Sequence, residues 1–337
     1  MRRQTGMVAD VQLVEAVEYA LRAPSVHNTQ PWRWRIGQGA IELHADWDRH
    51  LTVTDPDRRD LVISCGAALH HLLVALAARG IAADVHRLPD PEDSSHLATV
   101  LARAEQTGGA GGAEAALYPA IALRHTDRRR MSHRPVPPDR LRSLAEHAAR
   151  AGARLVPVTN ASERSRLLAL LVEAARAQST EPGYTAELRM WSDRPPGAHD
   201  GVPATAVAAP PIGTRGPSPL RRFTRTGLPQ PHQQPGHGPG DDAAELMAIA
   251  TPGDDVLDRL RAGEATSAVL LAATRLGLAT TPLSQALEVP VSREHLQQDV
   301  LHIPEHPQLL IRVGWPATGA AELPTTPRRS LAHMLLP

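Results

Sequence analysis

The strongest constraint on the fold is a pattern that occurs twice in the chain. An alanine- and leucine-rich helical stretch runs from Gly66 to a glycine stop at Gly80, and a similar stretch runs from Gly263 to Gly277. Each pair of glycines is fourteen residues apart, and an aspartate-rich turn precedes each copy, at 55–57 and at 253–255. Such self-similarity predicts an internal duplication. The alternative is a coincidental match between two apolar helices.

The hydrophobic periodicity predicts a mixture of helices and strands that forms an α+β chain. Helices are expected over 11–21, 61–79, 113–123, 138–151, 161–178, 184–191 and 263–276, and strands over 32–36, 41–45, 83–88, 97–101, 154–158, 246–250 and 308–313. A glycine-rich joint is expected over 108–112.

The composition points away from several functions. Of the 337 residues, 42% are hydrophobic, and 36 basic side chains balance 36 acidic ones. This balance gives no electrostatic reason to expect a nucleic acid or an anionic membrane as partner. The single cysteine, Cys65, excludes an internal disulfide, and its place at the start of a core helix predicts a packed thiol. We find neither a signal peptide nor a run of about 20 apolar residues, which predicts a soluble cytoplasmic protein.

The composition changes sharply over 192–242, where prolines and glycines are frequent and no hydrophobic period survives. A segment of this kind inside a compact domain is either a disordered insertion or an ordered functional cover. Apolar residues that could anchor a cover are spread along it, at Val202, Val207, Ile212, Leu220, Phe223 and Leu228.

Three short motifs carry the chemistry: Ala-Pro-Ser-Val-His-Asn-Thr-Gln-Pro-Trp at 23–32, Arg-His-Thr-Asp-Arg-Arg at 124–129, and Thr-Pro-Arg-Arg at 326–329. In the second motif, an arginine fork, a ring donor and a hydroxyl lie together, which suits a phosphate. Arg128 would face the same way as Thr126 in an extended segment. The alternatives are a solvated basic run for the arginines and simple capping of backbone groups for Ser25 and Asn28.

Together with Gly-Trp-Pro at 314–316, these motifs resemble the flavin-binding signature of the nitroreductase family. Ordinary members carry the arginine motif before the Ala-Pro-Ser motif in one short chain, and two chains build the site. Here the order is reversed in one long chain, as in the fused Acg-like branch from actinobacteria. The resemblance implies the nitroreductase fold as a pseudo-dimer of two degenerate repeats, 8–112 and 113–191 with 243–337, under a Pro-rich lid at 192–242.

The resemblance also assigns FMN contacts to three parts of the chain, and it implies one complete flavin site. The stretch 277–284 resembles the strand and loop beside the reactive edge of the ring, although it lacks the usual acidic residue or glycine. The implied cofactor-binding residues are Pro24, Ser25, His27, Asn28, Gln30, Arg124, His125, Thr126, Arg128, Pro282, Leu283, Ser284, Arg328 and Arg329.

Three functions follow from the resemblance. The first is an oxidoreductase in which NAD(P)H reduces FMN, and FMN reduces a nitroaromatic, a quinone or a similar small acceptor without help from a catalytic side chain. The second is a protein that sequesters FMN under a closed lid, and the third is a structural paralogue without flavin. Histidines such as His70 and His71 lack ligand-like spacing, so no metal is expected. The resemblance further implies a monomer or a weak homodimer.

Overall fold

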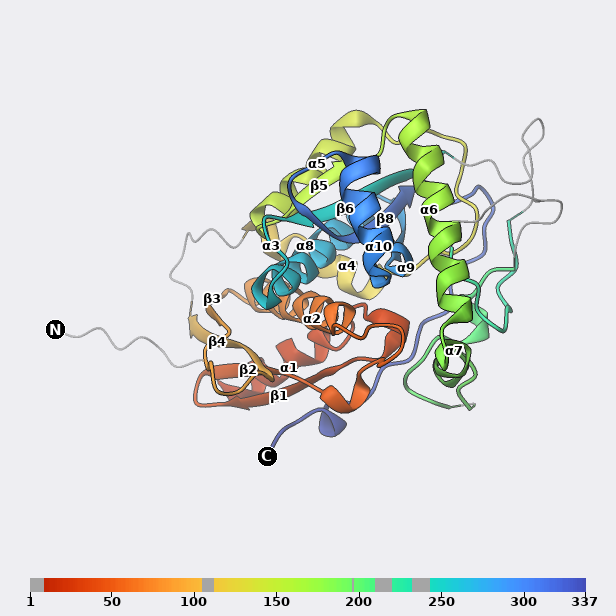
Figure 1. Ribbon diagram of the computed structural model, residues 1–337. Helices are drawn as coiled ribbons and strands as arrows, with labels where there is room; N and C mark the ends of the chain where they lie inside the picture. The colour runs from red at the N-terminus through yellow and green to blue at the C-terminus, as the bar shows by residue number, and fades with distance from the viewer. Residues whose placement is uncertain (1–8, 105–111, 196, 210–219, 232–242) are drawn as a thin grey trace.

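The computed structural model describes residues 9–104, 112–195, 197–209, 220–231 and 243–337 (Figure 1). The first half contains α1 (Asp10–Ala20), β1 (Trp32–Gly37), β2 (Ala40–Ala45), α2 (Arg59–Ala77), β3 (Ile81–Arg87) and β4 (His96–Ala104). The second half contains α3 (Gly112–Ala115), α4 (Tyr118–Leu123), α5 (Pro138–Arg150), β5 (Arg154–Pro157), α6 (Ala161–Thr180), α7 (Tyr184–Ser192), β6 (Glu245–Thr251), α8 (Val256–Arg275), β7 (Ala279–Leu283), α9 (Gln285–Glu288), α10 (Pro290–His295) and β8 (His306–Gly314). The fold is α+β, as predicted.

The two sheets are built in the same way. Each has four antiparallel strands, in the orders β1-β2-β4-β3 and β5-β6-β8-β7. In both, the long helix, α2 or α8, connects the second strand to the third. The register also shifts at equivalent places, between Leu43 and His44 in one sheet and between Ile249 and Ala250 in the other. This correspondence supports the predicted duplication, with α6, α7 and the 192–242 segment inserted in the second copy.

Helices α2 and α8 pack against each other between the sheets and form the centre of the molecule (Figure 1). They cross at the two glycines matched in the sequence. A Cβ on Gly66 would overlap the carbonyl oxygen of Leu260, and one on Gly263 would overlap that of Ile63. Helix α2 is long and apolar enough to cross a membrane, contrary to the sequence expectation, but most of it is buried in this protein. Its apolar character therefore follows from its central position.

The helix boundaries depart from the predictions in three places, each with a local cause. The helix predicted over 113–123 is two helices, because Pro119 starts a new one within the first turn of α4. Helix α8 begins before Gly263, because the Asp255 side chain accepts a hydrogen bond from the Asp258 backbone amide (2.8 Å) and caps an earlier turn. Helices α9 and α10 were not predicted. Pro290 occupies the first position of α10.

Two segments connect the halves. Beyond β8, the chain returns to the first sheet. There the Trp34 amide donates to the carbonyl of Met334 (2.8 Å), and the Leu336 amide donates to that of Trp34 (2.7 Å). In the 192–242 segment, Val202, Val207 and Leu228 are buried, as expected for apolar anchors. Ile212 and most of the predicted 108–112 joint lie outside the described residues.

Candidate functional site

A two-part cavity lies between the halves. Its apolar pocket is bordered by α2, β7 and the insertion, and includes Ile63, Ala67, Leu283, Leu309 and Phe223. Its basic pocket is bordered by α1, α4 and the C-terminal segment, and includes Arg22, Arg124, His125, Arg328 and Arg329. Both pockets are lined by Pro24, Ser25, Thr126 and Arg128, so they meet at the two predicted motifs.

The loop after α1 is a tight turn fixed by its own polar side chains. His27, Asn28 and Gln30 have positive φ angles of 43°, 55° and 52°. Ser25 Oγ accepts from the Gln30 amide (2.9 Å), while Ser64 Oγ on α2 accepts from the Val26 amide (3.1 Å). Ser25 therefore shapes the loop as well as lining the cavity.

Asn28 and Gln30 connect this loop to distant segments. Asn28 Nδ2 donates to the carbonyls of Gly201 (3.0 Å) and Pro327 (3.2 Å), and its Oδ1 has no partner among the described residues. Gln30 is fully buried and, alone among the predicted site residues, does not line the cavity. Its side chain accepts from the Arg329 amide (2.9 Å) and donates to the carbonyl of His199 (2.9 Å). Gln30 therefore holds the loop after α1 against neighbouring segments and does not itself line the cavity.

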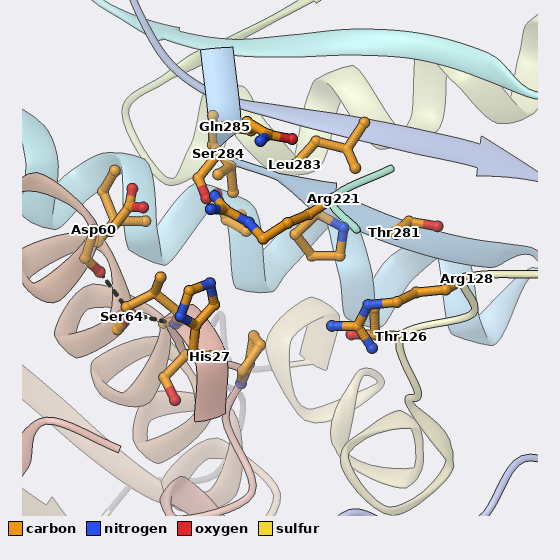
Figure 2. A pocket seen from close by; sticks show the side chains of 18 of the residues that line it. His27, Asp60, Ser64, Thr126, Arg128, Arg221, Thr281, Leu283, Ser284 and Gln285 are labelled. Atoms are coloured by element: carbon orange, nitrogen blue, oxygen red, sulfur yellow. Dashed lines mark hydrogen bonds between the residues drawn. The ribbon is translucent and has the colours of Figure 1, made fainter. Parts of the chain in front are cut away.

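The arginine motif lies beside β7 as a short extended segment. Thr126 bridges Thr280, and Thr281 Oγ1 donates to the carbonyl of Asp127 (2.6 Å). Thr126 and Arg128 face the cavity, as the alternation predicts (Figure 2). Asp127 faces away and forms a buried ion pair with Arg129 (2.9 Å).

Besides the exposed Arg22, three arginines face the cavity without a carboxylate partner among the described residues. Arg124 is buried, whereas Arg128 and Arg328 are partly exposed. Burial lowers the pKa of Arg124 and of Arg128 to about 10, and burial with the charges of Arg124 and Arg22 lowers that of Arg328 to about 9. The Nε atoms of Arg124 and Arg328 have no hydrogen-bond partner within the described chain. This arrangement favours binding of an anion.

The opposite end of the cavity carries acidic groups that the sequence analysis missed. Arg221, from the insertion, forms a nearly buried ion pair with Glu288 of α9 and donates a hydrogen bond to the Tyr184 hydroxyl. Asp60, at the start of α2, lines the apolar pocket with Ser284 and Gln285 (Figure 2). No motif marks these residues, because they come from four separate parts of the chain.

His27 also faces the apolar pocket. Its ring lies edge-on to Phe223, with centroids 5.9 Å apart, and neither ring nitrogen has a partner among the described residues. Burial, with smaller contributions from Arg221 and Arg128, lowers its pKa to about 3, so the ring is neutral at physiological pH.

Away from the cavity, the first sheet brings together the possible metal ligands Glu42, His44 and His96, whose ligand atoms lie within 4.8 Å of one another. The two imidazoles stack with centroids 4.4 Å apart, and Arg35 donates to the Glu42 carboxylate (2.5 Å). Stacked rings direct their in-plane lone pairs alongside each other, and the carboxylate already has a cationic partner. The cluster is therefore a poor metal site.

Comparisons with known proteins identify the class of protein to which this chain belongs. The model of the nitroreductase family matches residues 121–315, and the chain belongs to this family. It is 44% identical over 327 residues to "Putative NAD(P)H nitroreductase Rv3131" of Mycobacterium tuberculosis, covering 97% of this chain and 92% of the relative. It is 33% identical over 328 residues to "Putative NAD(P)H nitroreductase acg" of the same organism, covering 96% and 95%. The family and the Acg-like branch predicted from the motifs are confirmed.

A solved structure supports the fold over nearly the whole chain. A crystal structure described as a putative nitroreductase from Anabaena variabilis superposes with a TM-score of 0.52, covering 93% of this chain and 90% of that one at 9% identity. At this identity the likeness shows the fold alone.

Proposed function

We propose that the cavity binds one FMN, with the isoalloxazine ring in the apolar pocket and the phosphate in the basic pocket. The observation that carries this proposal is the set of three desolvated arginines without acidic partners, placed next to an apolar pocket. The unpartnered Nε atoms of Arg124 and Arg328 are buried donors that an anionic phosphate would satisfy.

In this arrangement Arg124, His125, Arg328 and Arg329 would hold the phosphate. Pro24 and Ser25, at the junction of the pockets, would contact the ribityl chain or the ring edge, and Pro282, Leu283 and Ser284 would border the ring. Bound FMN supplies hydride and electron transfer, while the protein binds, orients and shields it. The proposed reaction passes electrons from NAD(P)H to a small nitroaromatic, quinone or similar acceptor.

The test is retention of FMN by the double variant Arg124→Ala, Arg328→Ala. We expect wild-type protein to show flavin absorption and to release about one FMN per chain, and the double variant to bind FMN at least about 100-fold more weakly because two charge-assisted contacts are lost. Arg103→Ala is the matched control, because Arg103 is an exposed arginine paired with Asp84. Unchanged FMN affinity in the double variant would refute the phosphate site.

A second function, sequestration of FMN, is favoured by one observation. Leu220, Arg221 and Phe223 of the insertion line the apolar pocket, and Gly201 and His199 bond to the loop after α1. Segments of the insertion therefore cover the space proposed for the ring. Anaerobic reduction separates the functions: a reductase is reduced by NADPH within seconds, whereas a sequestering protein is reduced by dithionite but not by NADPH.

A further inference from the structure

Asp60 is a buried acid that lines the apolar pocket at the end where Ser284 and Gln285 also lie. Only 5% of its surface is exposed, and it lines the apolar pocket opposite Arg128 (Figure 2). Its Oδ2 atom has no hydrogen-bond partner among the described residues. A buried polar atom left without a partner is costly, so its presence in the wall of a ligand cavity requires an explanation.

The neighbouring charges favour a proton on Asp60. Asp55 lies before α2, Glu288 lies on α9, and Arg221 is the cation of this cluster. Arg221 pairs directly with Glu288, which also accepts from Ser284 Oγ (2.6 Å). Asp55 accepts the Leu61 amide (2.9 Å), and His27 is neutral. One arginine cannot compensate three buried carboxylates.

The pKa shifts agree with this count of charges. Burial, Asp55 and Glu288 together raise the pKa of Asp60 well above its ordinary value, whereas Arg221 holds that of Glu288 below its own. The charges around Asp60 therefore favour its protonated form, and Asp60 borders the pocket with one buried oxygen that has no partner among the described residues.

We propose that Asp60 donates a hydrogen bond, and then a proton, to an oxygen of an uncharged electron acceptor such as a quinone. This inference rests on the proposed reductase function and adds a catalytic side chain to it. Reducing a quinone to a hydroquinone consumes two electrons and two protons. A hydride carries both electrons and one proton. The second proton comes from Asp60, whose O–H bond breaks as that of the hydroquinone forms, and the carboxylate then regains a proton from solvent.

Besides Asp60, His27 and Thr266 also bring polar atoms without a partner among the described residues to the pocket, and both are less suited to this role. A ring with a pKa of about 3 carries no acidic proton at neutral pH, so it can offer only a neutral hydrogen bond. The hydroxyl groups of Ser64 and Thr266 are much weaker acids than a carboxyl group, and Ile63 and Ala67 bring no exchangeable proton.

The first test uses infrared spectroscopy and does not require turnover. Acetophenone, a neutral ketone, is added to the purified full-length protein, and the carbonyl stretch of the bound probe is recorded. We expect a shift to lower frequency in the wild type, a similar shift in Asp60→Asn, whose amide can still donate, and loss of the shift in Asp60→Leu. The same frequency in Asp60→Leu as in the wild type would overturn the hydrogen bond.

The second test compares two acceptors with the FMN-loaded protein. Menadione takes up protons on two-electron reduction, whereas ferricyanide takes up electrons alone. In Asp60→Asn we expect kcat with menadione to fall at least about 10-fold and kcat with ferricyanide to stay within about 2-fold. The wild-type menadione rate should also fall at high pH as Asp60 ionises, and the variant profile should lack this step.

The outcomes separate this inference from the proposed function. Equal losses with both acceptors, or none with either, would refute the role of Asp60 while leaving the reductase intact. Failure to bind FMN or to reduce ferricyanide in the wild type would refute the reductase, and the infrared test would still decide whether Asp60 binds a carbonyl oxygen. Asp57→Asn, an exposed carboxylate in the same turn region, is the control.

Discussion

At the residue scale, the cavity contains buried arginine charge that a bound anion would neutralise. Arg124 is buried, and burial lowers its pKa. Within the described residues, its Nη2 donates only to the carbonyl of Arg22 (3.4 Å). A charge desolvated without an ionic partner opposes folding until an anion binds. Binding and stability should therefore respond in opposite directions to its removal.

We expect Arg124→Met to raise the free energy of unfolding of the flavin-free protein by about 1–2 kcal/mol, because the apolar stem is kept and the buried charge is lost. With excess FMN, the wild type should instead be the more stable protein. Urea denaturation with and without FMN measures both effects. If the flavin-free variant is less stable than the wild type, Arg124 is structural and our account of it is wrong.

The raised pKa of Asp55 leads to a separate prediction about how the stability of the protein depends on pH. Burial raises its pKa from 3.8 to about 7, so the unfolded chain releases this proton near pH 4 and the folded chain releases it near pH 7. Stability should consequently fall as pH rises through this window. Asp55→Asn keeps an oxygen for the Leu61 amide but cannot ionise. Its stability relative to the wild type should increase by roughly 1–3 kcal/mol between pH 4 and pH 8.

The measurement is urea denaturation of both proteins at several pH values, and only their difference is compared. This choice matters because His27 and His71, whose pKa values are lowered by burial, make stability fall as pH decreases from about 6.5. A difference independent of pH would contradict the prediction, and Asp57→Asn should show none of this dependence.

At this scale, short sequence motifs marked residues that the fold brings together around one cavity. Thirteen of the fourteen predicted residues line the cavity, and Gln30 supports the loop instead. Asp60 and Arg221 were missed because their environment is made by tertiary contacts between segments that are separate in the sequence, such as the contacts of Arg221 with Tyr184 and Glu288. A local sequence pattern does not predict such a tertiary contact.

At the element scale, the close crossing of α2 and α8 decides how the sheets are placed. Gly66→Ala or Gly263→Ala would push a methyl group into the backbone of the facing helix, which cannot move without separating the two cores. We expect each substitution to destabilise the protein by about 3 kcal/mol or more. Gly37→Ala in β1 is the matched control, because nothing lies within 4 Å of its Cβ position.

Thermal or urea denaturation of the three variants tests this crossing. A loss below about 1 kcal/mol at both Gly66 and Gly263 would mean that the helices do not approach as closely as described. The result also bears on duplication, since the repeated sequence pattern assigns these two glycines to equivalent positions in the two copies.

Most elements were predicted because their apolar residues recur at helical or strand spacing over several turns. The failures share a physical cause. Helices α9 and α10 are four and six residues long, too short for a period to emerge, and they depend on packing against α6. The break between α3 and α4 depends on one proline within an otherwise continuous apolar stretch.

At the scale of the whole molecule, the cavity needs both halves of the chain. The loop at Pro24 and the helix α2 come from the first half, and the arginine motif and β7 come from the second. The C-terminal segment brings Arg328 and then extends the first sheet through Trp34. One chain therefore assembles what resembles a two-chain site, which explains why the motif order can be reversed.

This arrangement predicts that a monomer holds one FMN. A second cavity of the same kind would need its own arginine motif beside the glycine-containing face of the helix pair. There the described residues instead include a buried contact between His70 and Ser267 (2.7 Å) and an ion pair between Arg87 and Glu264 (2.7 Å). Glu264 neutralises Arg87, so this arginine does not offer a phosphate an unpaired charge. Light scattering coupled to size-exclusion chromatography, with flavin absorbance recorded in the same peak, should give one FMN at the mass of a single chain. Two FMN per chain, or flavin confined to a dimer peak, would show that the site is completed in another way.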